Sequence, residues 1–246
     1  MRLLLDIGNT RIKWGAFVQG RVREIGSMHH CYDWQTVVSR LKLEGNITTV
    51  NIASVAGVEV EQALSEIFKE QFDVQPIFHK SQQYCHGVTN AYQESWRLGV
   101  DRWLAIVAAW DRCGSAVCVV DCGTSVTIDF VTDTGCHLGG FILPGLALAC
   151  SSLLGGTKEV VCDIERSADS LSFGLNTAQA VYNGSVFSVV ASIEKAMNAH
   201  YEVSDVMPAL ILSGGDAARI APHLNIANTV VGALVLEGVH VAGKEV

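Results

Sequence analysis

The sequence predicts an α/β protein built from two copies of one unit of strands and helices, and two observations support this prediction. An apolar, strand-like run ends in DIGNT at residues 6–10, and a second such run ends in DCGTS at residues 121–125. The aspartates that begin these turns, at positions 6 and 121, are separated by close to half of the 246-residue chain. Segments with the strand period of two also alternate with segments that have the helix period.

The opening of the chain is expected to be a β-meander. Residues 3–5 are all leucine and lead into the first turn, after which Ile12, Trp14 and Ala16 alternate with other residues. Such alternation is typical of a strand with one buried face. A Gln19-Gly20 turn then leads to a third strand that ends near residue 26.

Further along the chain, helices and strands are expected to alternate. Trp103, Ile106, Val107 and Trp110 fall on one face of a helix that follows Gly99. The other expected elements are a helix over 33–43, a strand over 50–55, a helix over 63–72, a strand over 74–78, strands over 116–120, 126–131 and 209–212, and a last helix over about 228–241. We place the domain boundary near residue 114, which gives domains of residues 1–114 and 115–246.

Composition narrows the class of protein. Apolar residues make up 49% of the chain, charged residues only 17%, and the formal net charge is −8. Soluble domains carry about 25% charged residues, so a large core is expected and a disordered chain is excluded. An acidic chain without a basic run is not expected to bind nucleic acid. A small phosphorylated ligand remains compatible, because backbone N–H groups or a metal ion can hold it.

The sequence favours a cytoplasmic protein without a membrane span. Asp6 interrupts the apolar start too early for a signal peptide. The uncharged stretch 138–157 contains several glycines and Pro144, so we expect loops between short apolar pieces there. The eight cysteines show neither C-x-x-C nor zinc-finger spacing, which favours free thiols in a reducing compartment.

The first turn has the residue types of a phosphate-binding loop. Gly8 allows backbone amides to approach a phosphate closely, and Asn9 and Thr10 can donate hydrogen bonds to its oxygens. Lys13 adds a positive charge, and Asp6 can hold Mg²⁺ directly or through water. By itself the same pattern also fits a plain hairpin turn.

Two further turns fit the same chemistry. Asp121 to Ser125 repeat the first turn with hydroxyls at Thr124 and Ser125, so the two turns together can hold one phosphate chain. SGGD at residues 213–216 follows an apolar strand, and its glycine pair would let backbone lie against adenine and ribose. The alternative for SGGD is an ordinary loop or helix cap.

An acidic residue at a helix start is the remaining candidate. Asp101 falls in the first turn of the helix expected over 99–112, beside Arg102, and a helix N-terminus stabilises a carboxylate there. A charged helix start without function is the alternative. The sequence contains no G-x-x-x-x-G-K-[ST] motif, which excludes a P-loop protein.

Together these motifs resemble the actin-like ATPase superfamily, and over essentially the whole chain the sequence is similar to type III pantothenate kinases. Six segments carry the resemblance in order: DIGNTRIKW at 6–14, Tyr92 seven residues before GVDR at 99–102, VVDCGTSVTID at 119–129, GGFILPG at 139–145, SFGLNTAQAVYNG at 172–184 and LSGGD at 212–216. One position departs from the family, because Ser95 stands where a proline is usual.

The resemblance implies a fold, an activity and a set of ligands. The fold would be two duplicated actin-like, ribonuclease H-like domains with a nucleotide cleft between them. The activity would be ATP-dependent phosphorylation of pantothenate to 4'-phosphopantothenate, the first step of coenzyme A biosynthesis. Mg²⁺ and a monovalent cation, K⁺ or NH₄⁺, would assist, and the enzyme would be a homodimer.

The resemblance also implies residue roles. Asp101 would accept the proton of the pantothenate hydroxyl, Asp121 would bind the monovalent cation, and Asp6 would hold Mg²⁺. The residues implied to bind ATP are Asp6, Ile7, Gly8, Asn9, Thr10, Arg11, Ile12, Lys13 and Thr124, and those implied to bind pantothenate are Tyr92, Gly99, Val100, Asp101, Arg102 and Thr177.

Two alternatives to this function stay open. The chain can be a kinase for another small alcohol, since acceptor choice depends on pocket shape. It can also be a non-catalytic regulatory protein on the same fold, such as an accessory factor for transcription. The retention of Asp6, Asp101 and Asp121 favours a kinase over the regulatory protein.

Overall fold

Two five-stranded sheets with the same strand order form the framework of the chain. The first sheet has the order β3-β2-β1-β4-β5 and the second has the order β10-β9-β8-β11-β12. In each, the first three strands along the chain pair antiparallel, the fourth pairs in parallel with the central strand, and the fifth pairs in parallel with the fourth. The prediction of a duplicated α/β protein is therefore confirmed.

The computed structural model describes residues 1–29, 33–41, 46–154 and 171–244. The chain divides into two units, one made of residues 1–112 with 233–246 and the other of residues 113–232. Residues 233–246, expected from the sequence in the second domain, group instead with the first unit.

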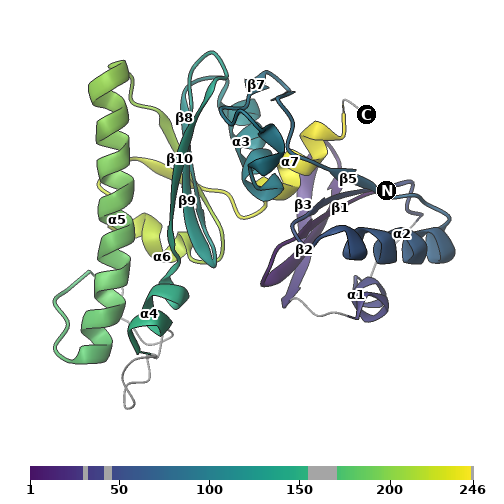
Figure 1. Cartoon of the computed structure of the whole chain (residues 1–246), viewed down its shortest axis with the longest axis horizontal. Coiled ribbons are helices and arrows are strands. Elements are labelled where there is room, and N and C mark those ends of the chain that lie inside the picture. Colours follow the sequence, from purple (N-terminus) through teal and green to yellow (C-terminus); the bar gives the residue numbers. More distant parts are fainter. Residues whose placement is uncertain (30–32, 42–45, 155–170, 245–246) are drawn as a thin grey trace. The chain divides into compact units, whose positions relative to one another are not determined.

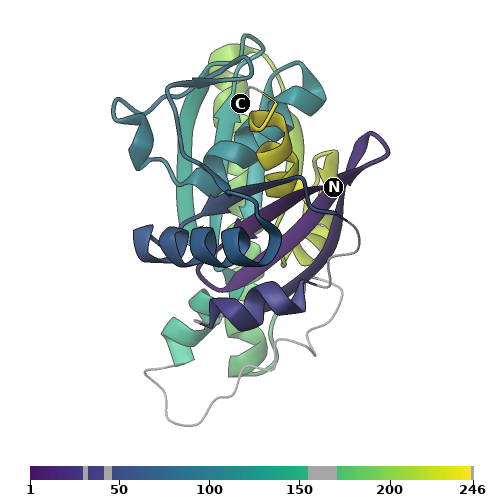
Figure 2. The same cartoon turned by 90° about the vertical axis from the view of Figure 1, so that its right-hand side faces the viewer.

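The first unit covers one face of its sheet with two helices. Leu3, Leu5 and Ile7 point to the same face of the central strand and pack against apolar side chains of α1 and α2. Figure 2 shows both helices on one side of the strands. The elements are β1 (Arg2–Ile7), β2 (Arg11–Val18), β3 (Arg21–His29), α1 (Trp34–Arg40), β4 (Thr49–Ser54), α2 (Val58–Phe72), β5 (Ile77–His79), β6 (Tyr84–Cys85), β7 (Val88–Thr89), η1 (Ser95–Arg97), α3 (Val100–Cys113) and α7 (Leu234–Ala242).

The last helix, α7, packs on this first sheet. The ring of His240 stacks on Phe17 with 3.8 Å between centroids, and Nδ1 of His240 lies 3.4 Å from Nη1 of Arg2. A β-carbon on Gly238 would lie 2.0 Å from the Leu104 carbonyl oxygen, so α7 and α3 meet backbone to backbone. The helix expected over 228–241 is instead a short strand followed by this helix.

The second unit packs one long helix against its sheet. Apolar residues of α5, among them Val186, Val189, Ile193 and Met197, form a core with side chains of β8, β9 and β11. Figure 1 shows α5 running along this sheet. The elements are β8 (Val117–Cys122), β9 (Ser125–Val131), β10 (His137–Pro144), α4 (Leu146–Leu154), α5 (Thr177–Ser204), β11 (Ala209–Ser213), α6 (Ala217–Ile220), η3 (Ala221–His223) and β12 (Asn228–Val230).

The stretch 138–157, expected as loops, contains the strand β10 and the helix α4 up to residue 154, and residues 155–157 lie outside the described part of the chain. Two of the glycines in this stretch are required by the conformation of β10. Gly139 has a φ of +93° where the pairing of β10 with β9 shifts register, and a β-carbon on Gly140 would lie 1.9 Å from the Ile128 carbonyl oxygen. A bulge and a close strand contact therefore require glycine here.

Cys85, Cys113, Cys118, Cys122, Cys136 and Cys150 are free thiols, while Cys31 and Cys162 lie outside the described part of the chain. None of the helices in the described segments combines the length and the apolarity that crossing a bilayer requires.

Candidate functional site

The first phosphate-loop candidate is the tight turn between β1 and β2. The Gly8 N–H donates to the Arg11 carbonyl at 3.0 Å, which closes the turn and leaves Asn9, Thr10 and Arg11 exposed. A β-carbon on Gly8 would lie 3.2 Å from that carbonyl oxygen, so this position favours glycine. The turn thus presents a short run of exposed backbone at the end of the central strand.

Asp6 and Lys13 share one face of the sheet at the base of this turn. They are directly paired across the antiparallel strands, and both are half-buried. Ile7 and Ile12 form the next pair, but their side chains are buried in the core. A contact of these two residues with a ligand would therefore come from the main chain alone.

The second phosphate-loop candidate repeats this arrangement between β8 and β9. The Gly123 N–H donates to the Ser125 carbonyl at 3.1 Å, and Asp121 is paired with Thr127 across the strands. Thr124 is exposed at the tip. The two loops, predicted from sequence as equivalents, thus occupy equivalent places in their sheets.

Two glycines pack directly on the second loop. A β-carbon on Gly145 would lie 2.2 Å from the Gly123 carbonyl oxygen, and the Gly145 N–H donates to the Thr124 carbonyl at 3.0 Å. Gly214 has a φ of +91°, and a β-carbon there would lie 2.4 Å from the Cys122 carbonyl oxygen. Residues 145 and 214 therefore bring the starts of α4 and α6 against the loop.

The electrostatics around the second loop are acidic. Burial, together with the nearby carboxylates of Asp121 and Asp216, raises the pKa of the Cys122 thiol to about 12. The Asp216 N–H donates to the Cys122 carbonyl at 3.0 Å, and its carboxylate pairs with Arg219. Cys122 therefore stays a neutral thiol, and the charge of this loop comes from its carboxylates.

The N-terminus of α3 holds Asp101 in a fixed position. Oδ1 of Asp101 accepts a hydrogen bond from the Arg102 N–H at 2.8 Å, and a β-carbon on Gly99 would lie 2.6 Å from the same oxygen. Asp101 is half-buried. Gly99 thus leaves room for this carboxylate.

Tyr92 meets the start of α3 through Arg102. Nη1 of Arg102 donates to the Tyr92 hydroxyl at 3.3 Å, and both side chains are half-buried. The carbonyl of Leu98, which precedes Gly99, accepts from the buried Ser81 hydroxyl at 2.7 Å. The structure therefore brings Tyr92, Gly99, Val100, Asp101 and Arg102 into one cluster, with the Val100 side chain buried.

Thr177 is the first residue of α5 and is exposed. It follows the cap residue Asn176, whose side-chain oxygen accepts from the Gln179 N–H at 2.9 Å. Phe173 and Leu175, just before it, are 95% and 91% exposed. Thr177 belongs to the second unit, whereas Tyr92 and Asp101 belong to the first.

The carboxylates of Asp6 and Asp121 suit metal ions that take most of their ligands from a bound nucleotide and water. Among the residues that the structure describes, no three His, Cys, Asp or Glu side chains gather as metal ligands. Mg²⁺ in phosphate sites is bound by one or two carboxylates together with phosphate oxygens and water. Half-buried single carboxylates beside the turns, Asp6 and Asp121, match that donor set.

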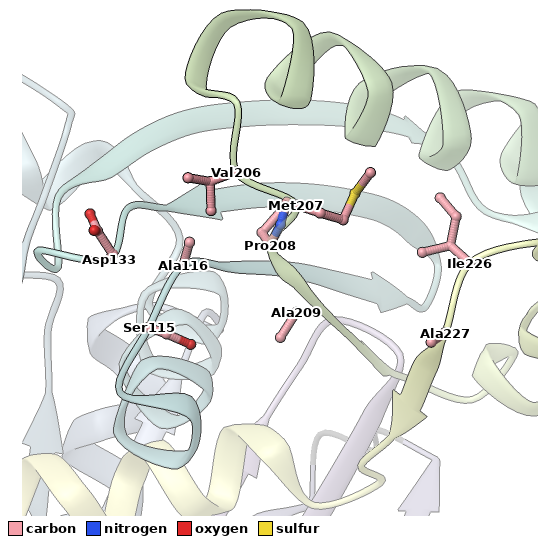
Figure 3. A pocket seen from close by; sticks show the side chains of 9 residues that line it. All are labelled: Ser115, Ala116, Asp133, Val206, Met207, Pro208, Ala209, Ile226 and Ala227. Atoms are coloured by element: carbon pink, nitrogen blue, oxygen red, sulfur yellow. The ribbon is translucent and has the colours of Figure 1, made fainter.

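A hollow of about 510 Å³ lies at the other end of the second sheet. It is lined by Ser115, Ala116, Asp133, Val206, Met207, Pro208, Ala209, Ile226 and Ala227, shown in Figure 3. Its walls are mainly apolar, and the charged residue among them is an acid. These walls carry no basic side chain for a phosphate, and they lie at the starts of β8 and β11 rather than beside the second loop.

Two structural contributors were not predicted from sequence. Gly145 belongs to the GGFILPG segment, but its contact with the second loop depends on how β10 folds back. Asn90 is buried between β7 and η1 and bonds to the backbone that carries Tyr92. An asparagine two residues before Tyr92 was the available signal, since Asn commonly bonds to backbone nearby.

Comparison with known proteins supports the sequence resemblance. The family model of type III pantothenate kinases matches residues 2–199 of this chain. The type III pantothenate kinase of Dechloromonas aromatica is 35% identical over 248 residues, which cover 99% of this chain and 100% of the relative. That of Alcanivorax borkumensis is 35% identical over 222 residues, 89% of each chain.

Solved structures with similar folds cover nearly the whole chain. A Campylobacter jejuni protein described as a Baf family transcriptional activator has a TM-score of 0.57 at 22% identity, over 99% of this chain and 98% of its own. A Listeria monocytogenes protein described as an N-acetylmannosamine kinase has a TM-score of 0.53 at 11% identity, over 99% of both chains. These likenesses concern the fold and confirm the predicted actin-like class.

Proposed function

Because the chain belongs to the type III pantothenate kinase family, we propose that it transfers the γ-phosphoryl group of ATP to the primary hydroxyl of pantothenate. The product is 4'-phosphopantothenate, formed in the first step of coenzyme A biosynthesis. The observation that carries the proposal is the pair of equivalent turns, each placing an aspartate, Asp6 or Asp121, at the end of a central strand.

Each of the two turns supplies groups that bind phosphate oxygens of ATP. The exposed residues Asn9 and Thr10 offer N–H groups and a hydroxyl, Gly8 keeps the turn tight through its hydrogen bond to the Arg11 carbonyl, and Lys13 at the base of the turn adds positive charge. Thr124 offers the corresponding hydroxyl from the second turn. Phosphoryl transfer depends mainly on positioning and charge stabilisation, which these groups supply. Ile7, Arg11 and Ile12 complete the first loop, the isoleucines through their main chain.

Asp101 accepts the proton of the acceptor hydroxyl. The pantothenate oxygen forms a bond to the γ-phosphorus, the bond between that phosphorus and the ADP oxygen breaks, and the hydroxyl proton passes to Asp101. The hydrogen bond from the Arg102 N–H fixes one oxygen of this carboxylate, which leaves the other to face the substrate. Tyr92, Gly99, Val100, Arg102 and Thr177 bind pantothenate.

Two cations assist the chain's own residues. Mg²⁺, held by Asp6 directly or through water, supplies positive charge to the transferring phosphates. A monovalent cation, K⁺ or NH₄⁺, lies at Asp121. The acidic surroundings of Cys122, to which Asp121 and Asp216 contribute, support a cation at this loop.

We also propose a cytoplasmic homodimer that binds neither nucleic acid nor membrane. Four large apolar side chains of the second unit are 55–62% exposed: Leu138, Phe141, Ile142 and Phe187. Apolar surface of this kind commonly marks a protein–protein interface. The free thiols among the described cysteines support a reducing compartment.

The test is ADP release by the purified protein with ATP, Mg²⁺ and pantothenate, in potassium and in sodium. We expect turnover that requires pantothenate and is faster in potassium. Turnover with pantothenate that ignores the cation would remove the cation site from Asp121 but keep the kinase. A folded protein that binds ATP but leaves pantothenate unchanged would contradict the proposal, and a panel of other alcohols would then identify its acceptor.

A further inference from the structure

Tyr92 lies in the connection between β5 and α3, residues 80–99, which has little regular secondary structure. It contains the two-residue strands β6 and β7 and the short helix η1. Backbone groups in such a segment lack the regular partners that helices and sheets provide. Side chains must therefore bond to this backbone to hold it in one conformation.

Asn90 supplies three of those bonds. It is only 4% exposed. Its Nδ2 donates to the Gln82 carbonyl at 3.1 Å and to the Ser95 carbonyl at 3.4 Å, and its Oδ1 accepts from the Tyr92 N–H at 2.9 Å. Its own main chain is tied to Gln83, whose carbonyl accepts from the Asn90 N–H and whose side chain donates to the Asn90 carbonyl, both at 2.9 Å.

From this geometry we propose that Asn90 is a positioning residue for the acceptor substrate. Its side chain bonds to the backbone at the Gln82 carbonyl, the Tyr92 N–H and the Ser95 carbonyl, and we call these three bonds the clamp. The clamp fixes the position at which the Tyr92 ring contacts pantothenate. The inference rests on the proposed function, in which Tyr92 lines the pantothenate site.

The chemistry of the clamp requires an amide of this length. An asparagine side chain can donate two hydrogen bonds and accept at the other end, and here it does both. Aspartate has the same shape but places oxygens against the Gln82 and Ser95 carbonyls. Alanine leaves those carbonyls and the Tyr92 N–H without this partner, and they are part-buried, where lost hydrogen bonds are costly.

Tyr92 is held by hydrogen bonds at both its backbone and its side chain. Asn90 fixes its backbone, and Arg102 donates to its hydroxyl at 3.3 Å. Arg102 directly follows Asp101 at the start of α3, so Tyr92 is tied to the helix turn that carries the proton acceptor. A displacement of about 1 Å at a positioning group can lower a rate by about 10²-fold.

The experiment compares Asn90→Ala with the wild type in steady-state kinetics at a temperature well below both unfolding transitions. We expect the KM for pantothenate to rise about tenfold, the equivalent of about 1.4 kcal/mol. The KM for ATP should stay within about twofold, because the clamp touches only the acceptor side. Isothermal titration with pantothenate should show the same loss in affinity without turnover.

Two further variants separate positioning from general damage. Asn51→Ala is the matched control, because Asn51 is 2% exposed in the same unit and bonds at 3.0 Å to buried His79 of β5, which lies outside residues 80–99. It should lose stability and keep its pantothenate KM. Asn90→Asp keeps the side-chain volume and the acceptor for Tyr92, and should still raise the KM for pantothenate because it lacks both donors.

A double-mutant cycle tests the route through Tyr92. In a Tyr92→Ala background, Asn90→Ala should change the pantothenate KM by less than about twofold, since the positioned ring is gone. A full effect in that background would overturn the inference, as would an unchanged pantothenate KM in Asn90→Ala and Asn90→Asp. Failure of the wild type to use pantothenate would instead overturn the proposed function, and this inference with it.

Discussion

A β-carbon on Gly214 would lie 2.6 Å from Oδ1 of Asp121, so the carboxylate proposed to bind a cation takes up space that a side chain at residue 214 would need. Ser213, next to Gly214, pairs in parallel with Asp121 across β8 and β11. The left-handed φ of +91° at Gly214 turns the backbone away at this point. The close approach keeps Asp121 beside the loop that begins α6.

The first prediction concerns Gly214→Ala. Positive φ and a clash with the Cys122 carbonyl should lower the free energy of unfolding by about 1–3 kcal/mol and raise the KM for ATP. Gly215→Ala is the matched control for stability, because a β-carbon there meets no atom within 4 Å. Urea unfolding of both variants and ATP titration of Gly214→Ala check the prediction, and an equal loss of stability in the two variants would contradict it.

The second prediction concerns Asp101→Asn. The amide keeps the shape and the hydrogen bond from Arg102 but takes up no proton, so kcat should fall about 10²–10⁴-fold. ATP binding, followed by titration, should change little. Asp133→Asn, in an exposed turn of the second unit, is the control and should keep its kcat. A drop of less than about fivefold would remove Asp101 as the proton acceptor.

The third prediction concerns Asp121→Asn. Loss of this charge should weaken the cation site, so that half-maximal activation needs about tenfold more potassium. The measurement is the initial rate against potassium concentration at constant ionic strength. If the variant and the wild type respond to potassium alike, the cation lies elsewhere.

The fourth prediction concerns acid stability. Burial, helped by Lys244 and Arg2, lowers the pKa of His240 from 6.5 to about 4, and burial also lowers the pKa of His79. Between these values the unfolded chain holds a proton on residue 240 that the folded chain does not. The free energy of unfolding should therefore fall as the pH drops from about 6.5 to about 4. Above that window, His240 should not contribute to the pH dependence of stability.

His240→Phe tests this sign, because it keeps a ring on Phe17 and removes the titrating group. Urea unfolding at several pH values should show a shallower decline below pH 6.5 than in the wild type. His29→Gln, at an exposed position of the same unit, is the control substitution of a histidine away from this packing.

The parts predicted correctly from sequence depend on local chemistry. Strand alternation through Ile12, Trp14 and Ala16 sets β2, and the two Asp-x-Gly turns stand out because Gly8 and Gly123 close tight turns wherever the flanking strands go. Tyr92 and Arg102 are ten residues apart and meet through a hydrogen bond, but their place in one site was implied by the family resemblance and not by local chemistry.

The parts not predicted depend on distant contacts. The 28-residue helix α5 has no counterpart among the expected elements, because Asn183, Gly184, Ser188 and Ser192 favour turns locally. Packing of its apolar residues on the second sheet outweighs those preferences. The helix α4 likewise falls within a stretch whose glycines suggested loops, and Gly145 acquires its role only when β10 has paired.

The return of α7 to the first unit has a consequence for synthesis. Residues 113–232 form a continuous unit that can fold as soon as it has left the ribosome. The first unit is made earlier but lacks the helix that packs on Phe17 and Leu104 until the last residues emerge. The earliest-made half of the chain is therefore the last to be completed, and a message truncated near residue 233 would yield a finished second unit joined to an unfinished first one.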